Sequence, residues 1–226
     1  MVTGTVAVKR IDHSRYLELL TEAKVLERDG YGEKVLALAD GTLIKIFRRK
    51  RWLSTALFLP YARRFVRNTR LLAERGVLTV CVVDTTYCPA VGRHLVTYQP
   101  LPGATLRQAL EDLTSERRRL LLVFAQYVAC LHRKGVYFRS LHFGNVIVPP
   151  DDGQLGLIDV ADLSLHARPL SIRRRVRNFR HMLRYAQDRA ALRECGWADF
   201  LNCYLAAEVL PARTRQMLLD RLGKML

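Results

Sequence analysis

The chain has 226 residues, 50% of them hydrophobic, and its 37 Lys and Arg against 21 Asp and Glu give a formal net charge of +16. This composition excludes disorder and suits one large domain or two small lobes. No segment reaches the roughly 18 apolar residues of a membrane span, and residues 1–10 lack the apolar stretch of a secretory signal. The 5 cysteines include no C-x-x-C pair, which predicts a reducing compartment and neither disulfides nor a zinc site.

The positive charge is concentrated in three arginine-rich runs, at residues 48–51, 117–119 and 173–177. Fields of this kind attract nucleic acid, anionic lipid or phosphorylated substrates. Each run by itself also suits a solvated helix face. The charge therefore predicts a polyanionic partner without selecting its class.

The N-terminal half has the turn signals and short apolar runs of a β-rich region. A Gly at position 76 is a suitable helix stop and Ser54 a suitable N-cap. The elements that we expect are a helix over residues 14–26, strands over 34–39 and 42–47, a helix over 54–76, and strands over 78–83 and 94–98.

An Asp-Gly pair joins the first two strands, which is a strong signal for a two-residue hairpin turn. In the second strand Lys45 shares one face with Leu43 and Phe47, whereas Ile44 and Ile46 lie on the other face. Because its neighbours on that face are apolar, we expect Lys45 to point inward rather than into solvent.

Pro and Gly at residues 99–103 predict a boundary between an N-terminal lobe, residues 1–100, and a C-terminal lobe, residues 101–226. The second half is mainly helical, and a β-rich region followed by a helical one indicates an α+β fold. We expect a helix over 115–134 with Leu120, Phe124, Val128 and Leu131 buried, a loop over 137–145, a hairpin over 146–148 and 155–158, and helices over 172–185, 197–205 and 212–226.

The most informative stretch is residues 131–148, LHRKGVYFRSLHFGNVIV, followed by GLID at 156–159. An L-H-x-x-G-V helix end, an L-H-x-G-N loop and a hairpin ending in I-D resemble the catalytic core of protein-kinase-like folds, most closely the small-molecule kinases. The resemblance implies that Asn145 and Asp159 bind Mg²⁺, a cation that prefers hard oxygen ligands and bridges ATP phosphates. Asn145 is alternatively a turn residue that caps the loop.

Upstream residues stand where the same family has its ATP site, and the resemblance spans about residues 25–185. It implies that Lys45 neutralises the α- and β-phosphates and that the turn with Gly30 and Gly32 covers them. It also implies that the backbone from Gln99 to Leu101 holds adenine.

Within this superfamily, the short basic chain and the run LSIRRRVRN at residues 170–178 are similar to bacterial lipopolysaccharide core kinases of the Kdo and heptose type. The family implies a two-lobed protein-kinase-like fold with a small β-rich N-lobe and a short helical C-lobe. It also implies a cytoplasmic enzyme, peripheral on the inner face of the inner membrane. Such an enzyme transfers the ATP γ-phosphate to a sugar hydroxyl of an anionic glycolipid.

The chain departs from this family at two positions. Ser140 stands where the family has the loop Asp, and a serine hydroxyl cannot accept a proton near neutral pH, which removes a general base. The nearest substitutes are His142, which also suits a structural role, and Asp162. On the helix that follows the hairpin, Glu74 lies near the helix end, and the place of the family's glutamate is nearer Asn68. The Asn68 amide could orient Lys45 by hydrogen bonding, or Asn68 is an ordinary polar residue bonded to backbone.

Three hypotheses follow. An active kinase is favoured by Lys45, Asn145 and Asp159, because phosphoryl transfer depends mainly on positioning and charge neutralisation. A pseudokinase that regulates or scaffolds envelope biogenesis is favoured by Ser140 and Asn68. A nucleic-acid-binding module would use the arginine runs, but neither an aromatic RNA-binding motif nor zinc-ligand spacing supports it.

Overall fold

The computed structural model describes residues 8–48, 61–112, 116–151 and 153–226. The chain divides into two compact units, Met1–Arg70 with Val80–Leu101, and Leu71–Thr79 with Pro102–Leu226. Residues 71–79 thus belong to the second unit, whereas the predicted division assigned all of 1–100 to the first. The predicted N-cap Ser54 lies outside the described residues. Among the described helices, none is long and apolar enough to cross a bilayer.

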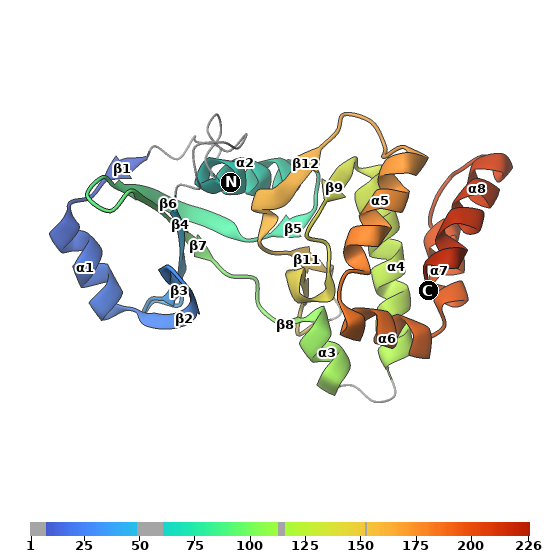
Figure 1. Ribbon diagram of the computed structural model, residues 1–226, viewed down its shortest axis with the longest axis horizontal. Coiled ribbons are helices and arrows are strands. Elements are labelled where there is room, and N and C mark those ends of the chain that lie inside the picture. Colours follow the sequence, from blue (N-terminus) through green and yellow to red (C-terminus); the bar gives the residue numbers. More distant parts are fainter. Residues whose placement is uncertain (1–7, 49–60, 113–115, 152) are drawn as a thin grey trace. The chain divides into compact units, whose positions relative to one another are not determined.

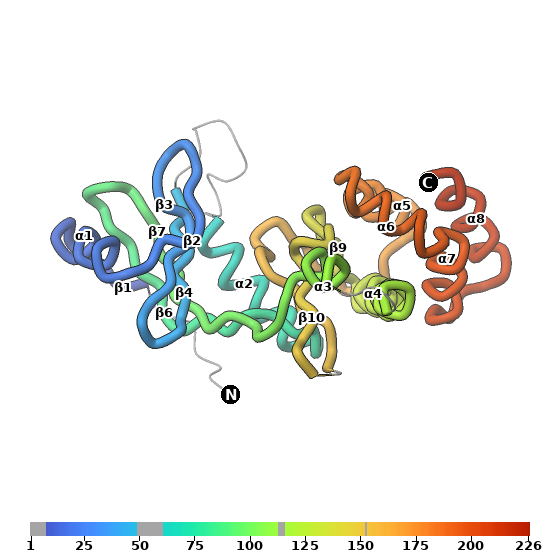
Figure 2. Tube along the Cα trace, turned by 90° about the horizontal axis from the view of Figure 1, so that it is seen from below, coloured from blue at the N-terminus to red at the C-terminus, as the bar shows by residue number. Residues whose placement is uncertain are grey.

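The first unit is built on a six-stranded sheet with the order β1-β6-β7-β4-β3-β2. Its strands pair antiparallel except for β1 with β6. The elements are β1 (Lys9–Arg10), α1 (His13–Glu22), β2 (Lys24–Asp29), β3 (Gly32–Ala37), β4 (Leu43–Arg48), α2 (Tyr61–Glu74), β6 (Cys81–Cys88) and β7 (Arg93–Gln99). Figures 1 and 2 show the strands of this sheet together with helix α1.

The predicted helix over residues 14–26 is wrong at its end. Asp12 caps α1 by accepting the backbone N–H of Arg15 at 2.8 Å, as an N-terminal Asp should. The helix ends at Glu22, and the next residues form β2, which pairs antiparallel with β3. Ladder hydrogen bonds to a strand further along the chain therefore outweigh the local helical pattern.

The predicted hairpin and its two faces are confirmed. Strands β3 and β4 pair antiparallel with Val35 opposite Lys45, and Gly41 in the turn has a φ of 82°. Ile44 and Ile46 pack into a buried cluster with Tyr16, Leu36, Cys88 and Leu95. The other face of β4 meets α2, where the rings of Phe47 and Phe65 are 5.6 Å apart.

The second unit combines short strands with six α-helices among its described residues. A four-stranded sheet has the order β5-β11-β10-β8, and β12 pairs with β9. The elements are β5 (Leu78–Thr79), β8 (Ala104–Thr105), α3 (Leu106–Asp112), α4 (Arg117–Arg133), β9 (Val136–Phe138), η2 (Phe143–Asn145), β10 (Val146–Val148), β11 (Gly156–Leu157), η3 (Val160–Asp162), β12 (Leu163–Leu165), α5 (Ile172–Met182), α6 (Ala186–Glu194), α7 (Trp197–Ala206), α8 (Ala212–Leu222) and η4 (Gly223–Met225).

Several predicted elements need correction. The strand expected over 78–83 is two strands in different sheets, because β5 pairs with β11 while β6 pairs with β7. The start of the loop expected over 137–145 belongs to β9. Helix α6 was not expected at all. The hairpin of β10 and β11 and the other helices are confirmed within a few residues.

The core of the second unit lies around α4, with α7 packed against it (Figure 2). Phe124 of α4 contacts the rings of Phe143 and Phe200. The predicted stripe is right except at its start, where Leu121 rather than Leu120 is buried. Gly135 ends this helix region with a φ of 72°, and an added Cβ would lie 2.3 Å from the His166 carbonyl oxygen, so only glycine fits.

Candidate functional site

The loop after β9 and the segment after β11 are joined by a backbone hydrogen bond. The N–H of Ile158 donates to the carbonyl of Asn145 at 3.1 Å. The buried Asn145 side chain donates through Nδ2 to the Ser140 carbonyl at 2.9 Å, which leaves its Oδ1 as the atom able to bind a cation. Asn145 and Asp159 therefore stand on paired segments, with oxygen ligands of the kind that Mg²⁺ prefers.

Asp159 has an uncommon backbone conformation. Its φ of 53° and ψ of 43° place it in the left-handed region, and among the described residues no other non-glycine has a positive φ. This conformation costs an L-residue roughly 1–2 kcal/mol, although Asp tolerates it better than most. Strain of this kind concentrates at functional sites. The flanking structure thus holds a carboxylate at the end of an apolar strand in a conformation that local preference does not favour.

The three residues considered for the acceptor proton lie in different surroundings. Ser140 is half-buried. His142 packs its ring against Tyr185 with the centroids 4.9 Å apart, and its Nδ1 has no hydrogen-bond partner among the described residues. Burial is the main cause that lowers the pKa of His142, so the ring is neutral at pH 7. Asp162 accepts two hydrogen bonds from Arg139, at 2.6 and 3.2 Å.

Two residues that the sequence analysis missed hold this loop in place. The Asp188 side chain on α6 is fully buried and accepts the backbone N–H of Phe143 at 3.1 Å. It also accepts hydrogen bonds at 3.0–3.2 Å from the guanidinium of Arg107 on α3. An acid in the first turn of a helix is expected on electrostatic grounds alone. Nothing in the sequence therefore marks Asp188 as a loop anchor.

A buried polar network supports the strand that leads into the loop. The Asn178 amide donates to the Phe138 carbonyl at 2.7 Å, so its Oδ1 faces His132 Nε2 at 3.1 Å and accepts from it. His132 Nδ1 then accepts from the Tyr204 hydroxyl at 2.9 Å, and Arg175 donates to that hydroxyl at 2.7 Å. Burial, followed by the charge of Arg175, lowers the pKa of His132 to about 3. Both ring nitrogens of the neutral His132 therefore have hydrogen-bond partners.

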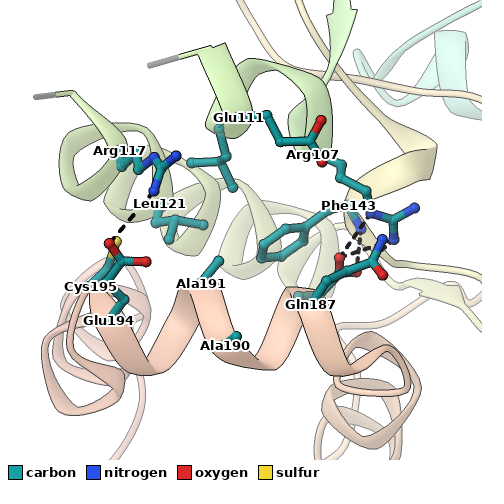
Figure 3. A pocket seen from close by; sticks show the side chains of 12 residues that line it. Arg107, Glu111, Arg117, Leu121, Phe143, Gln187, Ala190, Ala191, Glu194 and Cys195 are labelled. Atoms are coloured by element: carbon teal, nitrogen blue, oxygen red, sulfur yellow. Dashed lines mark hydrogen bonds and ion pairs between the residues drawn. The ribbon is translucent and has the colours of Figure 1, made fainter. Parts of the chain in front are cut away.

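A pocket of about 230 Å³ lies between α3, α4 and α6. Figure 3 shows Arg107 at one end and Arg117 beside Glu194 at the other, where these two are 3.6 Å apart. Phe143 lines the pocket from the loop side. None of the site residues predicted from the sequence lines it.

In the first unit Lys45 is buried on the predicted face of β4. Its Nζ lies 5.9 Å from the centre of the Phe65 ring of α2. Asn68 is also buried and follows Phe65 by three residues on the same side of α2. Glu74 is exposed as the last residue of α2. The side of α2 that meets β4 therefore carries the buried amide of Asn68, whereas the acid Glu74 is exposed at the helix end.

The turn with Gly30 and Gly32 joins β2 to β3. Gly32 has a φ of 113°, and a Cβ at either glycine would meet no atom within 4 Å. Asp29 accepts the N–H of Tyr31 at 2.9 Å and pairs with Arg48 at 3.1 Å. The exposed Gln99 ends β7, and the half-buried Leu101 is the last residue of the unit.

No family model and no curated protein matches the sequence. A solved structure, WaaP in complex with acyl carrier protein, matches the fold with a TM-score of 0.63 at 20% sequence identity, covering 93% of this chain and 90% of that one. The chain therefore has a mixed fold similar to the WaaP kinase fold, with a β-rich N-terminal sheet and a helical C-terminal part. This confirms the predicted two-lobed protein-kinase-like class.

Proposed function

We propose that the protein is an ATP-dependent phosphotransferase of the lipopolysaccharide core sugar kinase type. It would transfer the ATP γ-phosphate to a sugar hydroxyl of an envelope glycolipid. The observation that carries the proposal is the left-handed Asp159, held next to the Asn145 loop by the bond from Ile158 to Asn145. The fold similarity to WaaP, a lipopolysaccharide core heptose kinase, supports the same class of reaction.

The residues that would hold the cofactors are those predicted from the sequence. Asn145 Oδ1 and the Asp159 carboxylate would bind Mg²⁺, which supplies neutralisation of phosphate charge when it is bound. The buried Lys45 would neutralise the ATP phosphates, with Gly30 and Gly32 covering them. The backbone from Gln99 to Leu101 would hold adenine.

The acceptor hydroxyl has no carboxylate base at the usual position. Burial lowers the pKa of His142, so its ring is neutral, but its Nδ1 is itself buried and has no hydrogen-bond partner among the described residues. The carboxylate of Asp162 already accepts two hydrogen bonds from Arg139. We therefore assign the remaining catalysis to positioning and charge neutralisation, and His142 would act as the base only if a bound substrate exposes its Nδ1.

A pseudokinase of the same fold is the second candidate. It is favoured by Ser140 at the base position and by Asn68 on the side of α2 that faces the buried Lys45. Such a protein would bind nucleotide without transferring phosphate, or bind no nucleotide, and would act as a regulatory or scaffolding partner in envelope biogenesis.

Thermal unfolding with ATP, with and without Mg²⁺, tests the nucleotide site on the wild type and on Asp159→Ala. We expect Mg²⁺-dependent stabilisation that the variant loses. Phosphate transfer from γ-labelled ATP to lipid-linked core sugars then separates the two candidates. Binding with transfer supports the kinase, and binding without transfer supports the pseudokinase. No stabilisation at millimolar Mg-ATP contradicts the kinase and leaves a kinase-shaped binding protein.

A further inference from the structure

Helix α5 presents a row of arginines to solvent. At about 3.6 residues per turn, their positions fall within an arc of about 60° on the helix surface. The buried residues of the helix, including Phe179 and Met182, lie on the opposite side. All members of the row are exposed. This row, which we call the α5 arginine stripe, comprises Arg173, Arg177, Arg180 and, two residues beyond the helix, Arg184.

The charge of the stripe is not balanced by carboxylates among the described residues. No ion pair there includes a stripe arginine, and the sequence from 163 to 187 contains no Asp or Glu. The nearby carboxylates form ion pairs with arginines outside the stripe. Asp162 pairs with Arg139 and Glu208 pairs with the buried Arg175, while Asp188 pairs with Arg107.

This arrangement is unfavourable for the isolated helix. Like charges spaced three or four residues apart repel each other, and the first turn of α5 has arginines but no acid to face the positive end of the helix dipole. The pKa of His181 is lowered mainly by burial and then by the positive charges of Arg184, Arg177 and Arg139. An external anion would offset this repulsion.

The stripe lies next to the loop that contains Ser140. The Arg184 guanidinium donates to the Arg139 carbonyl at 3.2 Å, one residue before Ser140. His181 Nε2 lies 3.2 Å from the Tyr137 hydroxyl of β9, and α5 runs beside this strand (Figure 1). A surface bound by the stripe would therefore lie close to the acceptor side of the loop.

We propose that the α5 arginine stripe docks the protein on an anionic lipid surface by binding phosphate headgroups. Arginine suits this partner because its planar guanidinium binds phosphate through two parallel hydrogen bonds. The choice of lipid over nucleic acid rests on the proposed function, since a lipid-linked acceptor must reach the loop beside the stripe. Each arginine near an anionic surface raises partitioning roughly fivefold, so three contribute about a hundredfold.

Vesicle co-sedimentation of the full chain without nucleotide tests this proposal. The vesicles are phosphatidylcholine alone or phosphatidylcholine mixed with phosphatidylglycerol. The stripe variant is R173Q/R177Q/R180Q. The control variant, R213Q/R215Q/R221Q, removes the same charge from exposed positions spread around α8.

We expect the wild type and the control to bind only the anionic vesicles, more weakly as salt is raised, and the stripe variant to bind about a hundredfold less. Equal losses in both variants, salt-independent binding, or binding of the stripe to duplex nucleic acid but not to vesicles would overturn the proposal. Because the assay contains no ATP, a protein that docks but shows no Mg-ATP stabilisation contradicts the proposed function and leaves the docking surface intact.

Discussion

The buried carboxylate of Asp188 accepts the backbone N–H of Phe143 at 3.1 Å, two residues before Asn145. The same carboxylate binds the guanidinium of Arg107. Helix α6 thereby fixes the loop that presents Asn145, through a contact that spans 45 residues of sequence.

Because of this contact, two substitutions of Asp188 should differ in their effects on stability and on Mg-ATP affinity. Asp188→Ala leaves Arg107 without its buried partner and Phe143 without an acceptor, and should cost about 3–5 kcal/mol of unfolding free energy. Asp188→Asn keeps an acceptor oxygen for Phe143 and should retain more Mg-ATP affinity than the alanine variant. Urea unfolding and Mg-ATP titration measure both effects.

The control for Asp188 is Asp199→Asn. Asp199 forms an exposed pair with Arg118 at 2.8 Å, and pairs of this kind contribute about 0–1 kcal/mol. If the Asp199 and Asp188 substitutions destabilise the protein equally, the anchoring role of Asp188 is wrong.

Asp159→Asn should abolish the Mg²⁺-dependent part of ATP stabilisation while the apo protein remains folded, because Asn also tolerates the left-handed conformation. A ligand at about 100 times its Kd stabilises a protein by about 2.7 kcal/mol, so the lost shift is readily measured. Asp151→Asn, on an exposed turn of the same unit, should keep the shift. A full shift in Asp159→Asn would show that Mg²⁺ binds elsewhere.

Lys45→Met should lower ATP affinity about 10- to 100-fold, because a charge-assisted bond to phosphate is lost while the buried apolar volume is kept. Isothermal titration calorimetry measures this change. Lys34→Met is the matched control, since Lys34 lies on the adjacent strand and pairs with Glu27. Equal affinities of the two variants for ATP would exclude Lys45 from the phosphate site.

Ser140→Asp should raise phosphoryl transfer by about 10²–10⁴-fold if the missing general base limits the rate. Initial rates with γ-labelled ATP and the lipid-linked acceptor measure the gain. Ser164→Asp places the same charge on an exposed position of β12 and should leave the rate unchanged. An unchanged rate in Ser140→Asp would mean that His142 or charge neutralisation already suffices.

His132 predicts how stability depends on pH. Its pKa is about 3 in the folded state against 6.5 as the ordinary value, so the folded state binds fewer protons. His132 therefore leaves the free energy of unfolding unchanged above pH 6.5. Below that value, proton uptake by the unfolded state lowers this free energy by about 1.4 kcal/mol per pH unit. Urea unfolding between pH 7 and about pH 5 should show this slope. His132→Gln should reduce this slope without removing it, because the pKa values of His142, His166 and His181 are also lowered in the folded state. His13→Gln on the exposed start of α1 should not reduce it.

The sequence by itself determined the local features of this protein. The Asp-Gly turn and the two-residue alternation predicted the β3–β4 hairpin and the inward Lys45, because both patterns arise between neighbours in the chain. The order of the L-H-x-G-N loop and the I-D strand predicted the kinase-like fold class. It also singled out Asn145 and Asp159 as candidate Mg²⁺ ligands, and this role stays a prediction, although the structure joins their segments by a backbone hydrogen bond.

Only the tertiary structure decided the features that depend on residues far apart. Pairing with β3 makes residues 24–29 a strand, and β5 joins β11 across 78 residues. The Asp188 anchor and the left-handed Asp159 likewise depend on surrounding packing, since local preference marks neither. Local propensities differ by only about 1 kcal/mol or less. A few long-range hydrogen bonds and buried contacts therefore outweigh them, and the sequence read in order does not show which distant segments meet.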